Sequence, residues 1–302
     1  MPLPDRGKGT HMILVTGATG MSGQKIVREL VQNGVSAKAV VRSARKATTA
    51  GLDKLAGIDL VECDMQDEKG LIPALEGVDR ALLISSAGPD MRETQCRFID
   101  ACKAAGVGHV VKFSGAESGI GFDPAKFRFT RMHEEIEDHL EASGLAWTHL
   151  RPSQFMQVYL REAPTIARDQ ELRLPFGDTE LSPVAIEDIA RIACRLLRDG
   201  GHEGESLDVT GPEALTMHDV AERISAAIGR PVRYVPISSE ERRQALLESG
   251  APAGFVAAME EQLQERLKRP KSRVHLGTHA AFGVRPTNFA EFARTYASTF
   301  SG

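Results

Sequence analysis

Three glycines in the stretch MILVTGATGMSG, residues 12–23, have the spacing that a dinucleotide diphosphate needs. Gly17 permits a tight turn, Gly20 lets the backbone approach the phosphates, and Gly23 lets a following helix pack closely. The N-terminus of that helix would present N–H groups and partial positive charge to the anion. An apolar strand candidate before the glycines and an amphipathic helix candidate after them favour this role over an ordinary turn. The diphosphate is therefore expected to contact Gly17, Thr19, Gly20, Met21 and Gly23.

A second chemical signal follows the next strand candidate. No acidic residue occurs between Glu29 and Asp53, whereas Arg42, Arg45 and Lys46 come just after the strand. In dinucleotide folds an acid here binds the ribose 2′-hydroxyl of NAD, and a base accommodates the 2′-phosphate of NADP. A guanidinium can hold that phosphate with two hydrogen bonds. Solvated loop charge is the alternative role, but the position favours NADP(H) through Arg42 and Lys46, with NAD(H) as the second choice.

Strand and helix candidates alternate along the first half of the chain and must position these residues. Short apolar runs predict strands, and runs with apolar residues on one helical face predict the helices between them. This order predicts an α/β fold with a Rossmann-type, doubly wound parallel sheet, in which ligands gather at the carboxyl ends of the strands. The expected strands are residues 12–15, 35–41, 58–63, 81–86, 109–113 and 147–150, and the expected helices are 25–33, from 67 onward, 91–105 and 129–142.

The second half of the chain is predicted to add further strands and a small, mostly helical C-terminal lobe over the cofactor cleft. In the helix expected at 253–269, an apolar stripe is assigned to lobe core or a subunit contact rather than to a substrate pocket; it consists of Phe255, Met259, Leu263 and Leu267. Other expected elements are strands 172–175, 181–184 and 206–210 and helices 187–197, 217–228, 238–248 and 288–300. The predicted division is 1–11 as a leader or cloning remnant, 12–235 as the NAD(P)-binding domain whose later part contributes to the cleft, and 236–302 as the C-terminal lobe and closing helix.

Composition argues against several functional classes. The chain has 302 residues with 42% hydrophobic and 26% charged residues, as ordinary globular proteins have. A net charge of −4 gives no reason to expect a nucleic-acid partner, and no apolar run approaches the ~18 residues of a membrane span. Residues 1–11 lack the apolar core of a signal peptide. Four cysteines without a CxxC pair predict buried thiols in a reducing cytosol and no metal site. A cytoplasmic protein is expected, and its oligomeric state stays open.

The TGATGxxG pattern resembles the extended and atypical short-chain dehydrogenase/reductases. Most members of that family carry Ser…Tyr-x-x-x-Lys, in which the Tyr donates a proton and the Lys binds the nicotinamide ribose and lowers the pKa of the Tyr. None of the three tyrosines, Tyr159, Tyr234 and Tyr296, has a Lys four residues later. When the following SGLAWT segment fixes the register, Phe129 replaces the Tyr and His133 replaces the Lys. The usual proton relay is therefore expected to be absent.

Two polar residues remain as catalytic candidates. His133 is expected to touch the nicotinamide ribose or the substrate, although a lone helical histidine is normally solvated or satisfied. A pKa near neutrality would let it bind hydroxyls and supply a proton. Ser114, directly after the fifth expected strand, is the second candidate.

A closer resemblance is carried by TGATGxxG, by VVR followed by Lys46, by HxxxE with SGLAWTHLRPSQFM, and by SPVAIEDIA. Together these resemble the NmrA-like atypical reductases, and within them the triphenylmethane-reductase and NAD(P)H:quinone-oxidoreductase group, from Met12 to about Pro236. The resemblance implies that nicotinamide is lined by Pro152, Ser153 and Phe155, the alternative for Phe155 being an ordinary core position. At the short-chain reductase level, it implies that Asp64 accepts from the adenine amino group, unless it only caps the next helix. The remaining expected cofactor neighbours are Met65, Ala87, Gly88, Ser114 and His133.

The function expected from these features is NADPH-dependent hydride transfer to a small conjugated or aromatic acceptor, such as a quinone, dye or enone. The reduced acceptor can take its proton from water, so the missing Tyr is tolerable, and the enzyme mainly positions donor and acceptor. The alternative is a non-catalytic NmrA-like regulator that senses NADP(H) and acts through a protein partner, which the lost Tyr and Lys fit equally well. An epimerase or dehydratase is disfavoured because those enzymes generally keep the pair. The reductase is preferred because Ser114, His133 and the RPSQFM turn still furnish a site beside the nicotinamide, although a fold alone does not fix function.

Overall fold

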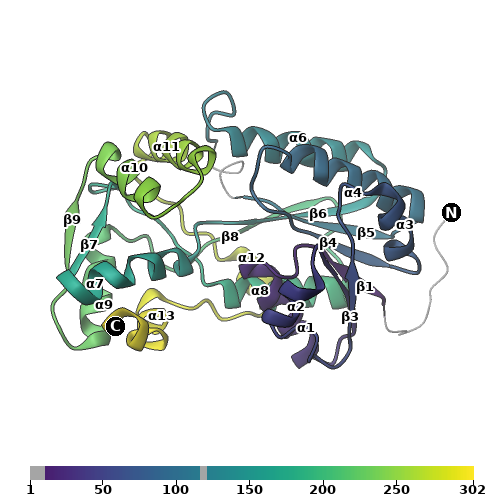
Figure 1. Ribbon diagram of the computed structural model, residues 1–302, viewed down its shortest axis with the longest axis horizontal. Coiled ribbons are helices and arrows are strands. Elements are labelled where there is room, and N and C mark those ends of the chain that lie inside the picture. The colour runs from purple at the N-terminus through teal and green to yellow at the C-terminus, as the bar shows by residue number, and fades with distance from the viewer. Residues whose placement is uncertain (1–10, 116–120) are drawn as a thin grey trace.

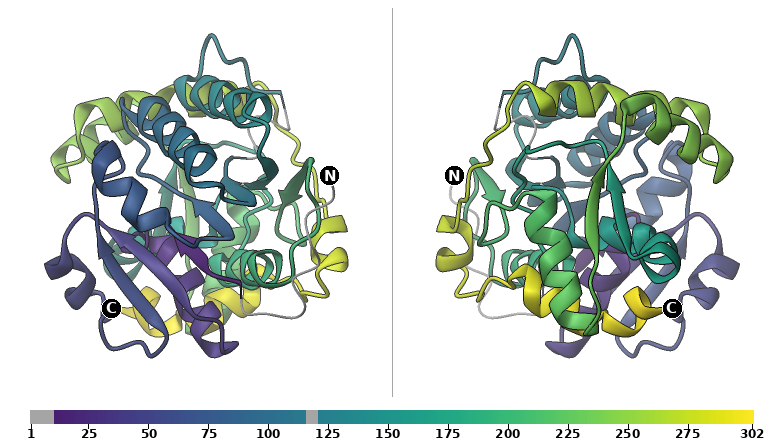
Figure 2. Two further views of the ribbon diagram at one scale, coloured as in Figure 1. Left: turned by 90° about the vertical axis from the view of Figure 1, so that its right-hand side faces the viewer. Right: turned by 90° about the vertical axis from the view of Figure 1, so that its left-hand side faces the viewer.

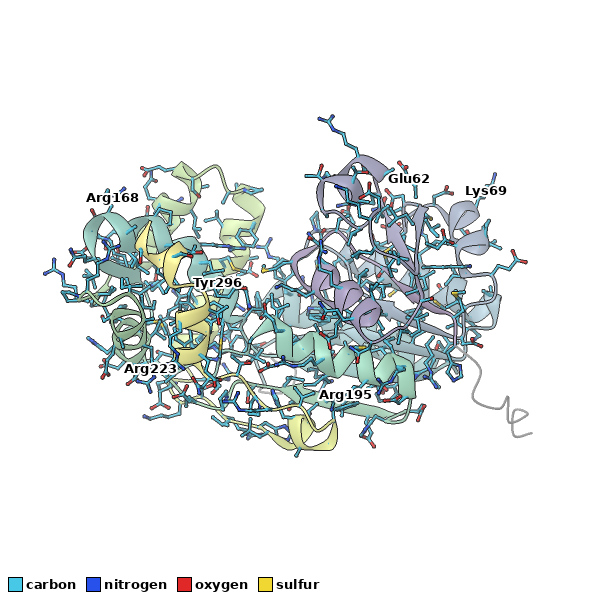
Figure 3. The ribbon with its side chains drawn as sticks, turned by 90° about the horizontal axis from the view of Figure 1, so that it is seen from below. Glu62, Lys69, Arg168, Arg195, Arg223 and Tyr296 are labelled. Atoms are coloured by element: carbon cyan, nitrogen blue, oxygen red, sulfur yellow. The ribbon has the colours of Figure 1, made fainter. Side chains whose placement is uncertain are left out.

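The computed structural model describes residues 11–115 and 121–302 and has two parts (Figure 1). The larger part is a twisted sheet between two layers of helices. The left view of Figure 2 faces the larger part, and the right view faces the smaller part. Seen from below in Figure 3, Arg168, Arg223 and Tyr296 belong to the smaller part, whereas Glu62 and Lys69 belong to the larger one. The site expected between cofactor and acceptor must therefore be built from both parts.

The main sheet has seven strands, all parallel, in the order β3-β2-β1-β4-β5-β6-β8. The strand order reverses between β1 and β4, which is the switch point where doubly wound sheets bind ligands. This confirms the predicted α/β, Rossmann-type fold. The strands are β1 (Ile13–Val15), β2 (Ala37–Val41), β3 (Ile58–Glu62), β4 (Arg80–Leu83), β5 (His109–Phe113), β6 (Ala146–Pro152) and β8 (Glu205–Val209).

Helices bury both faces of this sheet, since alternate side chains of each strand point to opposite faces. Ile13 and Val15 of β1 join one apolar core and Leu14 joins the other. The first core is covered by α1 (Met21–Gln32), α2 (Ala44–Thr49), α8 (Ile186–Asp199) and α12 (Gly277–Ala281), and the second by α3 (Glu68–Leu75), α4 (Met91–Ala105) and α6 (Arg128–Ala142) (Figure 1).

The smaller part has its own core around Tyr159, Leu172, Ile224 and Phe289. Segments on both sides of residue 235, the predicted domain boundary, contribute to this core; the boundary itself stays a prediction. The elements of this part are the 3-10 helix η1 (Met156–Glu162), α7 (Ala163–Asp169), α9 (Met217–Ile228), α10 (Ser239–Glu248), α11 (Ala253–Leu267), α13 (Phe289–Thr295), α14 (Ala297–Ser301) and the parallel pair β7 (Glu171–Leu174) and β9 (Arg233–Pro236).

Local sequence explains where several helices begin. Thr216 before α9 and Ser238 before α10 each form a capping box with the third helical residue, which satisfies N–H groups at the helix start. The Asp67 side chain accepts from the N–H of Lys69 at the start of α3. The helices at 91–105 and 217–228 and the strand at 109–113 have the predicted bounds.

Several predicted elements differ from the observed ones in extent or kind. The strand expected at 81–86 ends at Leu83, because the Thr16 hydroxyl accepts from the N–H of Ile84 at 2.8 Å and donates to its carbonyl at 2.7 Å. Residues 181–184 form no strand and make only single bridges to neighbouring segments. The closing helix is interrupted at Tyr296, whose backbone leaves helical geometry and whose hydroxyl donates to Glu187 on α8 at 3.2 Å. The short elements α2, α7, α12 and β9 were not predicted.

Two further absences concern only the described residues. Within 11–115 and 121–302, no helix is both long and apolar enough to cross a bilayer. The same residues contain no group of three or more His, Cys, Asp or Glu side chains that could hold a metal ion.

A close backbone contact at Gly211 fixes the segment between β7 and α8 against the end of β8. The Gly211 N–H donates to the Ser182 carbonyl at 3.1 Å, and a Cβ at Gly211 would lie 1.9 Å from the carbonyl oxygen of Pro183. The adjoining Val184 bridges Phe155, which the sequence places beside the nicotinamide. Gly211 therefore helps to position Phe155.

We expect Gly211→Ala to destabilise the protein by about 1–3 kcal/mol, because the methyl group forces backbone atoms apart. Lower thermal and urea midpoints would show this. Gly254→Ala is the matched control: nothing lies within 4 Å of its Cβ position in helix α11. There alanine should leave stability unchanged or raise it by about 0.5–1 kcal/mol. Equal midpoints for the two variants would contradict the close approach.

Candidate functional site

The glycine-rich turn between β1 and α1 is packed too tightly for side chains. Gly17 has a φ of +59°, and a Cβ there would lie 2.9 Å from the Ile84 carbonyl oxygen. A Cβ on Gly23 would lie 2.2 Å from the carbonyl oxygen of Gly17. Gly20 is the N-cap of α1 and, lacking a side chain, provides no cap of its own. The turn therefore leaves the helix start accessible to an anion, which fits the diphosphate of a dinucleotide.

A cavity of about 1250 Å³ runs along the carboxyl ends of β1 to β4, and we call it the strand-end cavity. It exceeds the ~300–1,000 Å³ typical of small-ligand pockets, so a dinucleotide fits its size. The structure places most of the predicted cofactor residues in its wall: Gly17, Thr19, Gly20, Met21, Gly23, Arg42, Lys46, Asp64, Met65, Ala87, Gly88, His133 and Phe155.

Of the three basic residues after β2, two line the strand-end cavity and one does not. Arg42 and Lys46 line the strand-end cavity, and Arg45 between them is exposed and does not line it. The Ser43 hydroxyl accepts from the N–H of Lys46 at 3.5 Å and caps α2, the unpredicted helix that carries Lys46. This wall of the cavity therefore presents two cations, as a 2′-phosphate would require.

Asp64 lines the strand-end cavity and does not cap the next helix, and its contact with adenine stays a prediction. Its carboxylate accepts from the N–H of Gln66 at 2.9 Å, which makes a turn, and the residue also lines the strand-end cavity. The cap of the next helix is Asp67 instead.

A second cavity of about 390 Å³, the apolar cavity, lies between the sheet and helices α10 and α11. Its volume is that of a small-molecule pocket. Pro152 and Ser153 line this cavity and not the strand-end cavity, and their place beside the nicotinamide stays a prediction. Aromatic and aliphatic side chains make up much of the wall: Phe127, Phe129, Phe155, Val158, Phe176, Leu246, Phe255, Val256, Met259 and Leu263.

The stripe on α11 was therefore assigned wrongly. Phe255, Met259 and Leu263 line the apolar cavity, and only Leu267 is left outside it with 38% of its surface exposed. Periodicity identified one face of the helix, but it did not show that this face meets a hollow rather than a neighbouring element.

Four residues line both cavities and mark their junction: Ala87, His133, Phe155 and Arg161. The Phe155 ring packs edge-on against Phe113 at the end of β5, with 6.2 Å between ring centroids. A ligand in one cavity would meet a ligand in the other at this junction.

Ser114 does not reach the junction. It is buried, its N–H donates to the Leu150 carbonyl at 2.8 Å, and it lines neither cavity, whereas Gly115 lines the apolar one. Its catalytic role stays a prediction that this placement does not support.

An ion pair anchors α6 to the end of β6 behind the junction. Arg151 donates to both oxygens of the Glu137 carboxylate, at 3.1 and 2.5 Å. Burial opposes ionisation of Glu137, but these hydrogen bonds and nearby positive charge keep its pKa below the usual value. The HxxxE and LRP motifs, which are separate in sequence, therefore meet in space.

His133 is bonded to a lysine that the sequence analysis missed. Lys112 on β5 is fully buried, and its Nζ lies 2.9 Å from Nδ1 of His133. Burial, and then the charges of Lys112 and Arg151, hold the pKa of His133 well below its usual value. The predicted pKa near neutrality was wrong, because a neighbouring cation disfavours the imidazolium. The available signal was a lysine inside the apolar run of a central strand, VVKF.

Known proteins resemble the chain over nearly its whole length. An NAD(P)H azoreductase from Xenophilus azovorans is 36% identical over 291 residues, covering 96% of this chain and 99% of the relative. The structure of an NADPH-dependent quinone oxidoreductase from Escherichia coli, complexed with NADPH, is 27% identical with a TM-score of 0.83, covering 94% and 99% of the two chains. The triphenylmethane reductase of Citrobacter sp. shares the fold, with a TM-score of 0.82 at 22% identity and coverage of 94% and 99%. The model of the NmrA-like family matches residues 9–292, and the chain therefore belongs to that family.

Proposed function

We infer that this protein is an NADPH-dependent reductase that acts on a small conjugated or aromatic acceptor, such as a quinone, dye or enone. The observation that carries this proposal is the junction at His133 and Phe155, two residues that line both the apolar cavity of about 390 Å³ and the strand-end cavity. A donor in one cavity and an acceptor in the other would have their reacting ends side by side, which is the main requirement of hydride transfer.

The strand-end cavity is proposed to hold the cofactor. The turn at Gly17, Gly20 and Gly23 would bind the diphosphate, and Arg42 and Lys46 would bind the 2′-phosphate. When bound, NADPH supplies the hydride. The names of the azoreductase and the quinone oxidoreductase support this use of the cavity.

The apolar cavity is proposed to hold the acceptor. Its aromatic walls would stack on a flat conjugated molecule and keep water from the reacting atoms. His133 at the junction would touch the acceptor, so no Tyr-x-x-x-Lys pair is required. Ion pairs hold both covering helices: Arg242 of α10 pairs with the buried Glu162 at 2.8 Å, and Arg128 of α6 pairs with Glu261 of α11 at 2.9 Å.

The direct test is to mix the protein with NADPH and a panel of quinones, azo dyes, cationic dyes and enones, and to follow absorbance of the reduced nicotinamide. Turnover of at least one class is expected. NADP(H) binding without any turnover, together with a co-purifying protein partner, would instead support the sensing regulator.

Arg42→Ala should weaken NADPH binding roughly 10- to 100-fold and leave NADH binding nearly unchanged, because it removes charge-assisted hydrogen bonds that only the 2′-phosphate can accept. Calorimetric titration with each nucleotide measures this. Arg45→Ala is the control, since it removes the same charge three residues away from a side chain outside the cavity. Equal losses for both nucleotides would show that Arg42 does not read the phosphate.

Met259→Trp should lower kcat/KM for the acceptor about tenfold or more by filling the apolar cavity, while the affinity for NADPH stays unchanged. Steady-state kinetics and nucleotide titration separate the two effects. The control is Leu267→Trp, which places the same ring on the same helix outside the cavity. Full activity of the Met259 variant would place the acceptor elsewhere.

A further inference from the structure

A buried lysine lies directly behind the junction without a carboxylate of its own. Lys112 is 0% exposed, and in the described part of the chain its Nζ has two hydrogen-bond partners, Nδ1 of His133 at 2.9 Å and the Phe113 carbonyl at 3.4 Å. Both partners are uncharged. A buried ammonium normally requires an anion, because burial without one is costly. A contribution to stability therefore does not explain why a lysine lies at this position.

The neighbouring charges explain why no anion compensates it. Glu137 on α6, a carboxylate whose charge acts on Lys112, accepts hydrogen bonds from two nitrogens of Arg151. Burial, against the opposing charges of Glu137 and Cys96 and with a smaller contribution from Arg151, lowers the pKa of Lys112 to about 7. The titratable and charged groups that face Lys112 are His133 and Glu137 from α6, Cys96 from α4, and His149 and Arg151 from β6.

We propose that Lys112 is the proton reserve of the site and that His133 passes its proton to the reduced acceptor. The proposal rests on the proposed reductase function. His133 lines both cavities, whereas Lys112 lines neither. His133 is thus the catalytic residue, and Lys112 is a positioning residue that acts through the ring.

The step conserves atoms and charge. An uncharged acceptor that has gained a hydride carries one negative charge. The Nε2–H of neutral His133 gives its proton to this anion, and Nδ1 takes a proton from the Lys112 ammonium. The products are a neutral reduced acceptor, a neutral amine, and the other neutral tautomer of the imidazole. The hydrogen bond between Nζ and Nδ1 persists with its direction reversed, and a water proton arriving by the same route restores the first state.

The chemistry of the acceptor supplies an internal control. Azo compounds and enones become strongly basic anions on gaining a hydride, so a proton must accompany it. A cationic triarylmethane dye becomes neutral on gaining a hydride and needs no proton. Loss of the relay should therefore affect the first kind of acceptor and spare the second.

The experiment compares Lys112→Met with the wild type in single-turnover reduction of an azo dye or enone and of a cationic triarylmethane dye. With the azo dye or enone, the variant should lose on the order of 10²-fold in rate below pH 7, as expected for loss of a general acid. The wild-type rate should fall as pH rises through about 7, since Lys112 is protonated below its pKa and loses its proton above it. The variant should show no such fall, and both proteins should reduce the cationic dye equally fast.

Lys38→Met is the matched control. Lys38 also projects from a strand of the sheet and donates only to carbonyls, of Ala74 at 3.1 Å and Glu76 at 2.7 Å, and it lines neither cavity. Its replacement should leave every rate unchanged. Equal losses by Lys112→Met on both dye classes, or a wild-type pH profile in that variant, would overturn the relay. Failure of the wild type with every acceptor would refute the reductase itself.

A readout independent of turnover uses ¹⁵N NMR of the histidine rings in the complex with NADP. The His133 ring should stay neutral in the wild type and change tautomer as pH passes through about 7, and this change should vanish in Lys112→Met. An imidazolium forming at the ordinary pKa of about 6.5, or the same change in both proteins, would contradict the proposal.

Discussion

The contact between the first turn and the first helix constrains every other part of the site. The start of α1 lies so close to the Gly17 carbonyl that a Cβ on Gly23 would come within 2.2 Å of it. This approach places the helix N-terminus at the switch point between β1 and β4, where its dipole faces the cavity. Under the proposed function, a diphosphate at this helix start would leave the rest of the cofactor to reach Arg42 in one direction and His133 in the other.

Behind that junction, the charges around Lys112 depend on the ion pair between Arg151 and Glu137. Arg151 binds both oxygens of Glu137, a carboxylate that acts on Lys112, and among the described residues the hydrogen-bond partners of this buried cation are uncharged. Burial of His133 and the positive charge of Lys112 then keep the His133 ring neutral. A free carboxylate beside the ring would instead favour its protonated form. Replacing such a lysine by an apolar residue would generally stabilise a fold, so stability does not account for it.

Local patterns predicted well which residues line the strand-end cavity, because these residues are neighbours in sequence. Gly17, Gly23 and Arg42 each follow a strand end or begin a helix, and alternation of strands and helices implies a parallel sheet that gathers them. The acceptor end depended on contacts between distant segments. Nothing near Phe255 in sequence shows that α11 faces a hollow, and nothing near Lys112 shows that Glu137 is already paired. Periodicity identifies a buried face but not what it faces.

The two ends of the site are therefore built by different parts of the chain. Turns after the first four strands line the strand-end cavity, whereas α10 and α11 cover the apolar cavity and are attached through the Glu162–Arg242 and Arg128–Glu261 pairs. Substitutions on those helices can reshape the apolar cavity without moving His133 or Lys112, which are fixed by α6 and β5. Under the proposed roles, one cofactor site and one proton source would serve acceptors of different shape, which is consistent with a shared fold in reductases named for azo, quinone and triphenylmethane substrates.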